Sequence, residues 1–261
     1  MLRALLAGIA FIILTIVLVA MLLILRAMRL PGRGVISQAY SRMICALLGV
    51  RITVQGALST DRAVLVVANH VSWLDILVIA ATAPTIFVAK SEVAGWPLVG
   101  IAARARGTVF VDRQRRHRSE DTNGEIAAQL AAGAAIVLFA EGTSSDGNRV
   151  LPFRSSLFGA VRQAGVEGIR VQPLSIAYLR IHGLPMGRRH RPVAAWYGDM
   201  DLAPHLVDLM KRGPLDVTLT WGDIQASRPD ADRKALAQAM EQAVRRITTD
   251  VLRGRPAAVR S

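Results

Sequence analysis

The 261-residue chain contains a single cysteine, Cys45, so an internal disulfide is excluded and the sequence suits a reducing compartment. Cys45 lies in an apolar stretch, where packing is a more natural role than nucleophilic chemistry. Lysine is almost as scarce, although the formal net charge is +13. The positive charge is therefore nearly all arginine, whose guanidinium matches phosphate geometry. A genome rich in G and C would raise the arginine content in the same way.

Charged residues are absent from residues 4–25, where Thr15 is the one clearly polar residue. A run of this length can cross a bilayer as a helix. It continues into Arg26 and Arg33 rather than a small-residue cleavage site, so we expect a retained anchor over residues 1–30. The positive-inside rule then predicts a single pass through the inner (cytoplasmic) membrane, with the rest of the chain in the cytoplasm. The alternative is a helix that lies along one leaflet, although the run lacks the polar face typical of interfacial helices.

The remaining chain is predicted to contain a linker and an amphipathic helix over residues 31–50, one domain over residues 51–252, and a flexible tail over residues 253–261. Short apolar runs alternate with helical periodicity, which predicts an α/β fold with a central mixed sheet flanked by helices. The expected strands are 51–55, 64–68, 85–89, 108–111, 135–139, 171–178, 192–197 and 216–221. The expected helices are 35–48, 73–81, 97–106, 119–132, 155–164, 202–210 and 230–252.

The pair His70 and Asp75 carries most of the chemical information. Asn69 and His70 follow strand 64–68, at the sheet edge where α/β proteins bind ligands. Asp75 lies about one and a half helical turns further on, close to the same face. A carboxylate there can bond one imidazole nitrogen, fix the tautomer and leave the other nitrogen as a general base. Taken alone, the pair also fits a structural histidine bonded to a nearby aspartate.

Four further motifs follow in order. The first is Lys90-Ser91-Glu92, and the second is a strand that delivers Arg113 to the same edge as His70. The third, Glu141-Gly142-Thr143-Ser144, follows strand 135–139, and the fourth is an apolar strand that contains Pro173. A base, a cation and an acid are therefore predicted to converge on one edge of the sheet.

This order of motifs, over residues 51–197, resembles the glycerolipid acyltransferases typified by lysophosphatidic acid acyltransferase. The resemblance implies a membrane-bound O-acyltransferase. It would move a fatty acyl group from acyl carrier protein or acyl-coenzyme A to the free hydroxyl of a lysolipid, beside an anionic membrane surface. No cofactor, metal or nucleic acid is implied. His70 would deprotonate the hydroxyl and Asp75 would orient His70. The implied substrate-binding residues are Asn69, Lys90, Arg113, Glu141, Gly142, Thr143, Ser144, Asp146 and Pro173.

Ser144 departs from the family pattern, in which an arginine linked to acceptor phosphate binding usually follows Glu-Gly-Thr. Its absence removes one charge-assisted contact, about 1.5–3 kcal/mol. Asp146 adds an anion nearby. These differences suit an acceptor that lacks a phosphate monoester or carries an amine, as in the lyso-ornithine lipid O-acyltransferase branch, which residues 196–205 also resemble. The product would then be ornithine lipid. The alternative acceptor is 1-acyl-sn-glycerol-3-phosphate, with Arg149 or Arg154 supplying the missing charge.

Two other classes of function compete with acyl transfer. A metal hydrolase built on His70, Asp75 and Glu141 would need a further clustered histidine or carboxylate, which the sequence does not offer. A non-enzymatic basic tether for anionic lipid would explain the arginines but not the ordered motifs.

Overall fold

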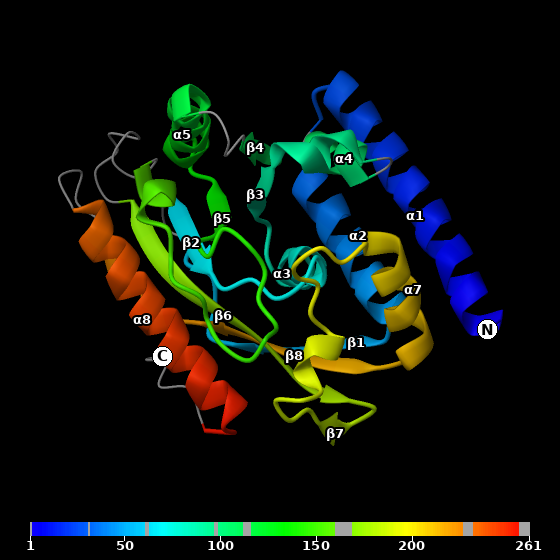
Figure 1. The fold of residues 1–261 in the computed structure, drawn as a ribbon. Helices are drawn as coiled ribbons and strands as arrows, with labels where there is room; N and C mark the ends of the chain where they lie inside the picture. The colour runs from blue at the N-terminus through cyan, green and yellow to red at the C-terminus, as the bar shows by residue number, and fades with distance from the viewer. Residues whose placement is uncertain are drawn as a thin grey trace.

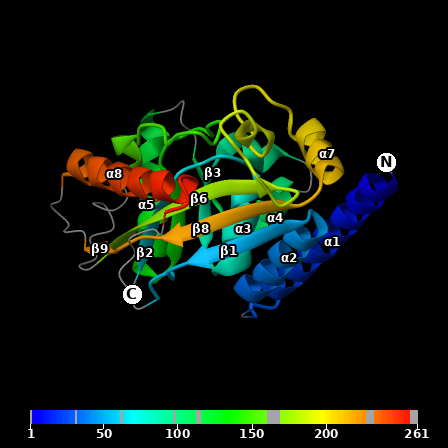
Figure 2. The same cartoon turned by 90° about the horizontal axis from the view of Figure 1, so that it is seen from below.

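The computed structural model describes residues 2–30, 32–60, 63–96, 99–111, 116–159, 169–226 and 232–255. It has three layers, a twisted central sheet between two layers of helices (Figures 1 and 2). One layer contains α1 (Leu2–Ala27), α2 (Arg33–Leu47), α3 (Leu74–Thr82), α4 (Val99–Ala105) and α7 (Leu202–Arg212). The other contains α5 (Arg116–Ala131) and α8 (Arg233–Leu252). This arrangement confirms the predicted α/β architecture.

The sheet is mixed, with the order β1-β8-β6-β2-β5-β3-β4. Strands β6, β2, β5, β3 and β4 run parallel, β8 is antiparallel to β6, and β1 is parallel to β8. The strands are β1 (Val50–Gln55), β2 (Val64–Ala68), β3 (Ile86–Lys90), β4 (Val109–Val111), β5 (Ala135–Phe139), β6 (Arg170–Ile181) and β8 (Leu215–Trp221). Two short strands, β7 (Leu184–Pro185) and β9 (Gln225–Ala226), pair with β6. Strand β2 is central in the sheet, its two faces belong to the two hydrophobic clusters under the helix layers, and all five of its residues are buried.

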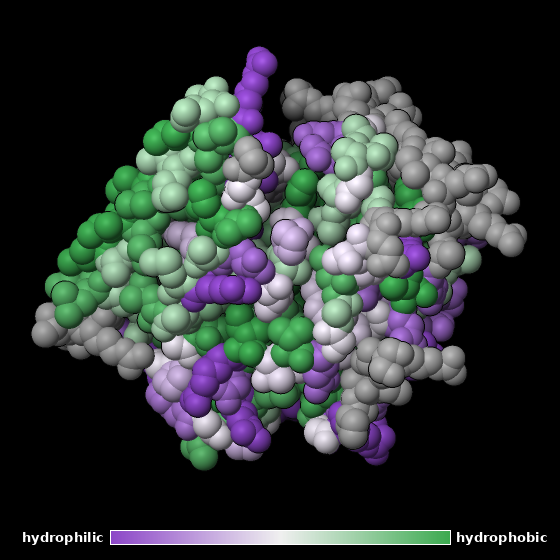
Figure 3. Space-filling view, turned by 180° about the vertical axis from the view of Figure 1, so that it is seen from behind, coloured by the Kyte–Doolittle hydropathy of each residue, from purple (hydrophilic) through white to green (hydrophobic). Residues whose placement is uncertain are grey.

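Helix α1 lies against the domain along one face. Leu18 and Leu22 pack with Ala105 of α4, Ala7 joins the core, and the Thr15 hydroxyl is 2.8 Å from the hydroxyl of Tyr40 in α2. The helix also contacts α7. The remaining faces of α1 are exposed and apolar, and hydrophobic side chains gather over it on the left of Figure 3. The helix is long and apolar enough to cross a membrane, and only 17% of its most apolar stretch is buried inside the molecule.

Helix α2 contributes to the core rather than only linking the anchor to the domain. Ile44 and Cys45 are buried in the same cluster as α3 and the sheet. Burial raises the pKa of the Cys45 thiol to about 12, which agrees with a packing role.

Two predicted elements differ from the structure. The strand expected over residues 192–197 is absent, and a 3-10 helix, η3 (Arg191–Val193), and a turn take its place. Pro192 has no N–H to give to a strand ladder, and the short apolar run packs against the loop after β2 instead. The helix expected over 155–164 begins as a 3-10 helix, η2 (Ser155–Phe158), and its continuation from residue 160 lies outside the described residues.

Candidate active site

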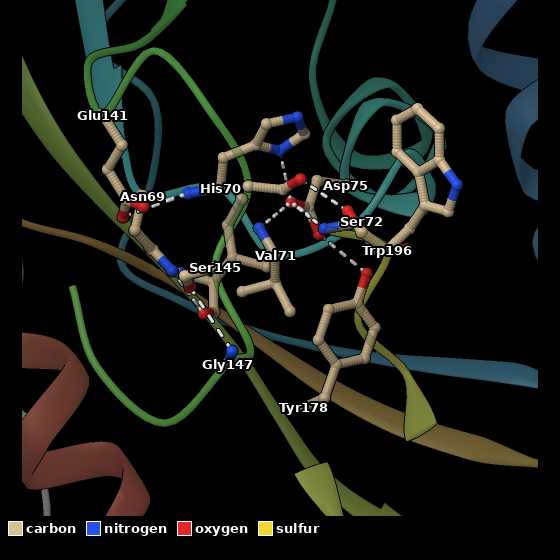
Figure 4. A network of polar contacts seen from close by, with 12 residues as sticks. Asn69, His70, Val71, Ser72, Asp75, Glu141, Ser145, Gly147, Tyr178 and Trp196 are labelled. Atoms are coloured by element: carbon tan, nitrogen blue, oxygen red, sulfur yellow. Dashed lines mark hydrogen bonds and ion pairs between the residues drawn. The ribbon is translucent and has the colours of Figure 1, made fainter. Parts of the chain in front are cut away.

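The site forms where two adjacent parallel strands end. Ala68 and Phe139, the last residues of β2 and β5, are register partners. His70 and Glu141 each lie two residues further on, so the pairing of the strands brings them together. The backbone N–H of His70 donates to Oε1 of Glu141 at 3.3 Å (Figure 4). The predicted convergence of a base and an acid is therefore present in the structure.

Asp75 is fully buried and accepts four hydrogen bonds. His70 Nδ1 lies 2.8 Å from Oδ2, and the backbone N–H groups of Val71 and Ser72 donate to the same oxygen at 2.7 and 3.0 Å. The Tyr178 hydroxyl donates to Oδ1 at 2.8 Å, so Asp75 lies between the imidazole and the phenol (Figure 4). A carboxylate held in this way is an acceptor for Nδ1–H, which leaves Nε2 of His70 without a proton.

The imidazole of His70 is stacked on Phe139, with ring centroids 4.0 Å apart, and its side chain is 17% exposed. One face of the ring is therefore covered by the core while part of the side chain reaches solvent. A base that abstracts a proton from a bound hydroxyl needs this combination of fixed orientation and access.

Glu141 is buried, with 2% of its surface exposed. Burial raises its pKa to about 8, and the charge of Asp75 adds to the rise. The backbone amides of His70 and Leu151 and the charge of Arg245 oppose it. Oε2 has no hydrogen-bond partner of good geometry within the described part of the chain. Glu141 thus accepts a hydrogen bond from the His70 backbone while its carboxyl group lies in a largely apolar environment.

Asn69 is almost fully buried, and its side-chain amide pairs with the backbone of β6. Nδ2 donates to the Ile176 carbonyl at 3.0 Å, and Oδ1 accepts from the Ile176 N–H at 2.8 Å. Both amide groups are occupied, so we expect Asn69 to position His70 rather than to contact substrate.

Gly142 has a φ of 73°, a backbone conformation that favours glycine. A Cβ at this position would come within 2.8 Å of Cδ and Nε of Arg154, whose backbone N–H donates to the Ala140 carbonyl. The exposed Arg154 side chain therefore lies across the turn next to Glu141. This turn is close to Ser144, the position at which the family that the sequence resembles usually has an arginine.

The half-buried Ser144 donates a hydrogen bond from its hydroxyl to the Trp196 carbonyl. The Trp196 N–H in turn donates to the Val71 carbonyl at 2.9 Å, and the Ser145 N–H donates to the His70 carbonyl at 2.8 Å. The segment after η3 and the loop after β5 are thereby both hydrogen-bonded to the loop after β2 that carries His70, which we refer to as the His70 loop. Because residues 192–197 were expected to form a strand, this contact was not predicted.

Asp146 accepts hydrogen bonds from the backbone and side-chain N–H groups of Asn148, each at 3.0 Å. Burial alone would raise its pKa, but these bonds and the charges of Arg149 and Arg188 outweigh it and lower the pKa. The carboxylate is therefore ionised and already has cationic neighbours. Its predicted contact with an acceptor amine remains a prediction.

The other predicted substrate-binding residues have different settings. Lys90 and Thr143 are exposed, Lys90 at the end of β3 and Thr143 in the turn after β5. Pro173 lies inside β6 opposite Val67, where its carbonyl accepts from Gly222, which argues for a structural role. Arg113 lies outside the described residues.

Tyr178 was not singled out from the sequence. It is separated from Asp75 by 103 positions, and only the pairing of β2 with β6 brings the two together. A tyrosine in an apolar strand gives no signal beyond the need of a buried hydroxyl for a partner.

Comparison with known proteins defines the class of this site. An acyltransferase family model matches residues 50–177. The lyso-ornithine lipid O-acyltransferase of Rhizobium meliloti (strain 1021) is 41% identical over 257 residues, which cover 97% of this chain and 88% of that protein. The protein of the same name from Brucella abortus (strain 2308) is 47% identical over 220 residues, covering 83% of this chain and 82% of that protein. The chain therefore belongs to the acyltransferase family and is an enzyme of acyl transfer.

A solved structure supports the fold independently. The crystal structure of the 1-acyl-sn-glycerophosphate acyltransferase from Thermotoga maritima aligns with a TM-score of 0.65 over 96% of both chains, at 23% identity. Family membership implies an acyl donor and a lysolipid acceptor. Together with the apolar helix α1, it indicates that the protein associates with a membrane.

Proposed function

We propose that this enzyme transfers a fatty acyl group from an acyl thioester to the hydroxyl of lyso-ornithine lipid and so makes ornithine lipid. The observation that carries the chemistry is the His70–Asp75 pair, with Nδ1 bonded to a buried carboxylate at 2.8 Å. The similarity to two lyso-ornithine lipid O-acyltransferases supports the acceptor.

In the proposed reaction, Nε2 of His70 accepts the hydroxyl proton while the oxygen attacks the thioester carbonyl carbon. A carbon–oxygen bond forms, the carbon–sulfur bond breaks, and the leaving thiolate takes the proton from the imidazolium. Asp75 stabilises that imidazolium through Nδ1–H. The chain needs to supply only proton transfer and positioning, because the thioester is already activated.

Ser144 supports an acceptor without a phosphate monoester, because its short hydroxyl is already used by the Trp196 carbonyl. One observation favours 1-acyl-sn-glycerol-3-phosphate as the alternative acceptor. Arg154 lies across Gly142, makes no ion pair with a described residue, and could supply a guanidinium to a phosphate.

The proposed location is the inner (cytoplasmic) membrane, with the domain on the cytoplasmic side. The sequence alone favours a single crossing by α1. The contacts of α1 with α2, α4 and α7 favour the alternative of a helix that lies in one leaflet. A helix that crosses the bilayer would have to give up these contacts with the domain. The donor is acyl carrier protein or acyl-coenzyme A.

A competition assay tests the proposed acceptor. Purified enzyme in mixed micelles receives a radiolabelled acyl donor and equal amounts of lyso-ornithine lipid and 1-acyl-sn-glycerol-3-phosphate. We expect ornithine lipid as the main labelled product. Preferential labelling of phosphatidic acid would contradict the proposed acceptor and leave the acyltransferase chemistry intact.

A further inference from the structure

An exposed turn between β7 and η3 brings basic residues next to the loop after β5. Arg188 on this turn and Arg191, the first residue of η3, lie close to Arg149 on the loop, and we refer to these three residues as the arginine cluster. Arg149 and Arg188 are exposed and Arg191 is half-buried. The charges of Arg149 and Arg188 both act on the carboxylate of Asp146.

The cluster is held together by Asn148. Its side-chain N–H donates to the Arg188 carbonyl at 3.0 Å, and its side-chain oxygen accepts from Nη1 of Arg191 at 3.2 Å. The same residue donates to Asp146 twice. The turn that carries Arg188 and the loop that carries Arg149 are therefore fixed to each other, and the guanidinium of Arg191 is held between them.

The cluster carries more positive charge than its surroundings neutralise. Arg51, Arg212 and Arg245 each pair with a carboxylate of their own. The three arginines of the cluster share Asp146. Desolvation and the charge of Arg188 lower the pKa of Arg191, and its buried Nε has no hydrogen-bond partner within the described part of the chain. Like charges held this closely favour binding of an anion.

The cluster lies close to the His70 loop. A Cβ at Gly147, between Asp146 and Asn148, would lie 3.2 Å from Cγ1 of Val71 and 3.8 Å from Cβ of Arg191. Val71 directly follows His70. In Figure 1 the turn after β7 is at the bottom, whereas α1 runs along the right-hand side, so this turn is set apart from the apolar helix.

We propose that the arginine cluster is the docking surface for an acidic acyl carrier protein that delivers the thioester; this inference rests on the proposed acyl transfer. The exposed guanidinium groups lie on two separate segments, so their partner must present several negative charges over a surface. An acidic protein helix does this, and its phosphopantetheine arm carries the thioester past the docking surface to His70. Such rim charges govern association rate and salt dependence.

Charge reversal tests the docking surface. Both exposed residues are changed in the variant Arg149→Glu/Arg188→Glu, and Arg246→Glu on α8 is the matched control. Each full-length protein is assayed in detergent micelles with two donors, acyl carrier protein and acyl-coenzyme A. We expect KM for acyl carrier protein to rise about tenfold or more in the double variant, with little change for acyl-coenzyme A. With the carrier protein as donor, wild-type activity should also fall more steeply with rising salt concentration than the activity of the double variant.

A binding measurement supplies a readout that is independent of activity. Immobilised wild-type enzyme should capture acyl carrier protein without any acceptor, and the double variant should not. Three results for the double variant would each overturn the docking surface. They are equal losses of activity with both donors, unchanged kinetics with both donors, and loss of binding to anionic vesicles instead of to carrier protein. Absence of transfer from either donor by the wild-type enzyme would refute the proposed function itself.

Discussion

The hydroxyl of Tyr178 donates a 2.8 Å hydrogen bond to Oδ1 of Asp75, on the side of the carboxylate that His70 does not use. Tyr178 is buried, so this bond forms away from solvent. It completes the fixation of Asp75, whose other oxygen is bonded to the imidazole and to two backbone amides.

Replacing Tyr178 with phenylalanine should leave one oxygen of a buried carboxylate without a donor. We expect a loss of about 1.5–3 kcal/mol in the free energy of unfolding. We also expect kcat to fall on the order of tenfold, less than the full loss of general-base help. KM for the acceptor should change little, because Tyr178 does not reach solvent. Tyr197→Phe, at an exposed position, is the control, and a rise in KM without a change in kcat would contradict the positioning role.

Glu141 should give the protein a distinctive dependence of stability on pH. Burial raises its pKa in the folded protein to about 8, against an ordinary value of 4.5. Between these values the folded state holds a proton that the unfolded state has released. The free energy of unfolding should therefore fall as the pH rises from about 4.5 to about 8 and level off above.

The variant Glu141→Gln keeps an acceptor for the His70 N–H but cannot ionise. Its thermal unfolding temperature should decline less than that of the wild-type protein over this pH range. Glu125→Gln, at an exposed position on α5, should follow the wild-type curve. Identical curves for Glu141→Gln and wild type would show that Glu141 does not titrate in this way.

Replacing Ser144 with arginine should shift the acceptor preference. A guanidinium gains more from a phosphate monoester than from a zwitterionic headgroup. The ratio of kcat/KM for 1-acyl-sn-glycerol-3-phosphate to that for lyso-ornithine lipid should rise roughly 10- to 100-fold, from a contact of about 1.5–3 kcal/mol.

The control Ser144→Ala removes the bond to the Trp196 carbonyl without adding charge and should leave the preference unchanged. The explanation based on Ser144 fails if the native enzyme already prefers 1-acyl-sn-glycerol-3-phosphate. Arg154→Ala would then be the variant to raise KM for that acceptor, because Arg154 lies over Gly142.

Much of the site could be predicted because it depends on local order. The apolar run before His70 and the one before Glu141 are buried strands, and each ends at the predicted edge of the sheet. Asp75 lies one residue into α3, so its approach to His70 follows from a helix start. These relationships need only a few residues of sequence.

The contacts that were missed depend on long-range pairing. The bond from Tyr178 to Asp75 and the pairing of Asn69 with Ile176 both require the β2–β6 register, which no local pattern reveals. The Trp196 segment has an apolar run that suits a strand, yet in the structure it packs on the His70 loop. Burial of that run was predictable, but its partner was not.

The position of the N-terminus distinguishes the two arrangements of α1. If α1 lies in one leaflet, as its packing against Ala105 and Tyr40 favours, an N-terminal epitope tag stays on the cytoplasmic side. Antibody should then reach the tag only after the inner membrane is permeabilised. Labelling of the tag on intact spheroplasts would support the single crossing instead. A tag on the C-terminus is the control and should be protected in both arrangements.

The most direct test of the account is acyl transfer by His70→Ala. General-base help is worth typically 10²–10⁴-fold, so transfer to lyso-ornithine lipid should fall by about that factor while the protein stays folded, as its thermal unfolding transition shows. His182→Ala, at an exposed histidine on the turn before β7, should retain full activity. Near-normal turnover by folded His70→Ala enzyme would contradict the proposed role of the His70–Asp75 pair.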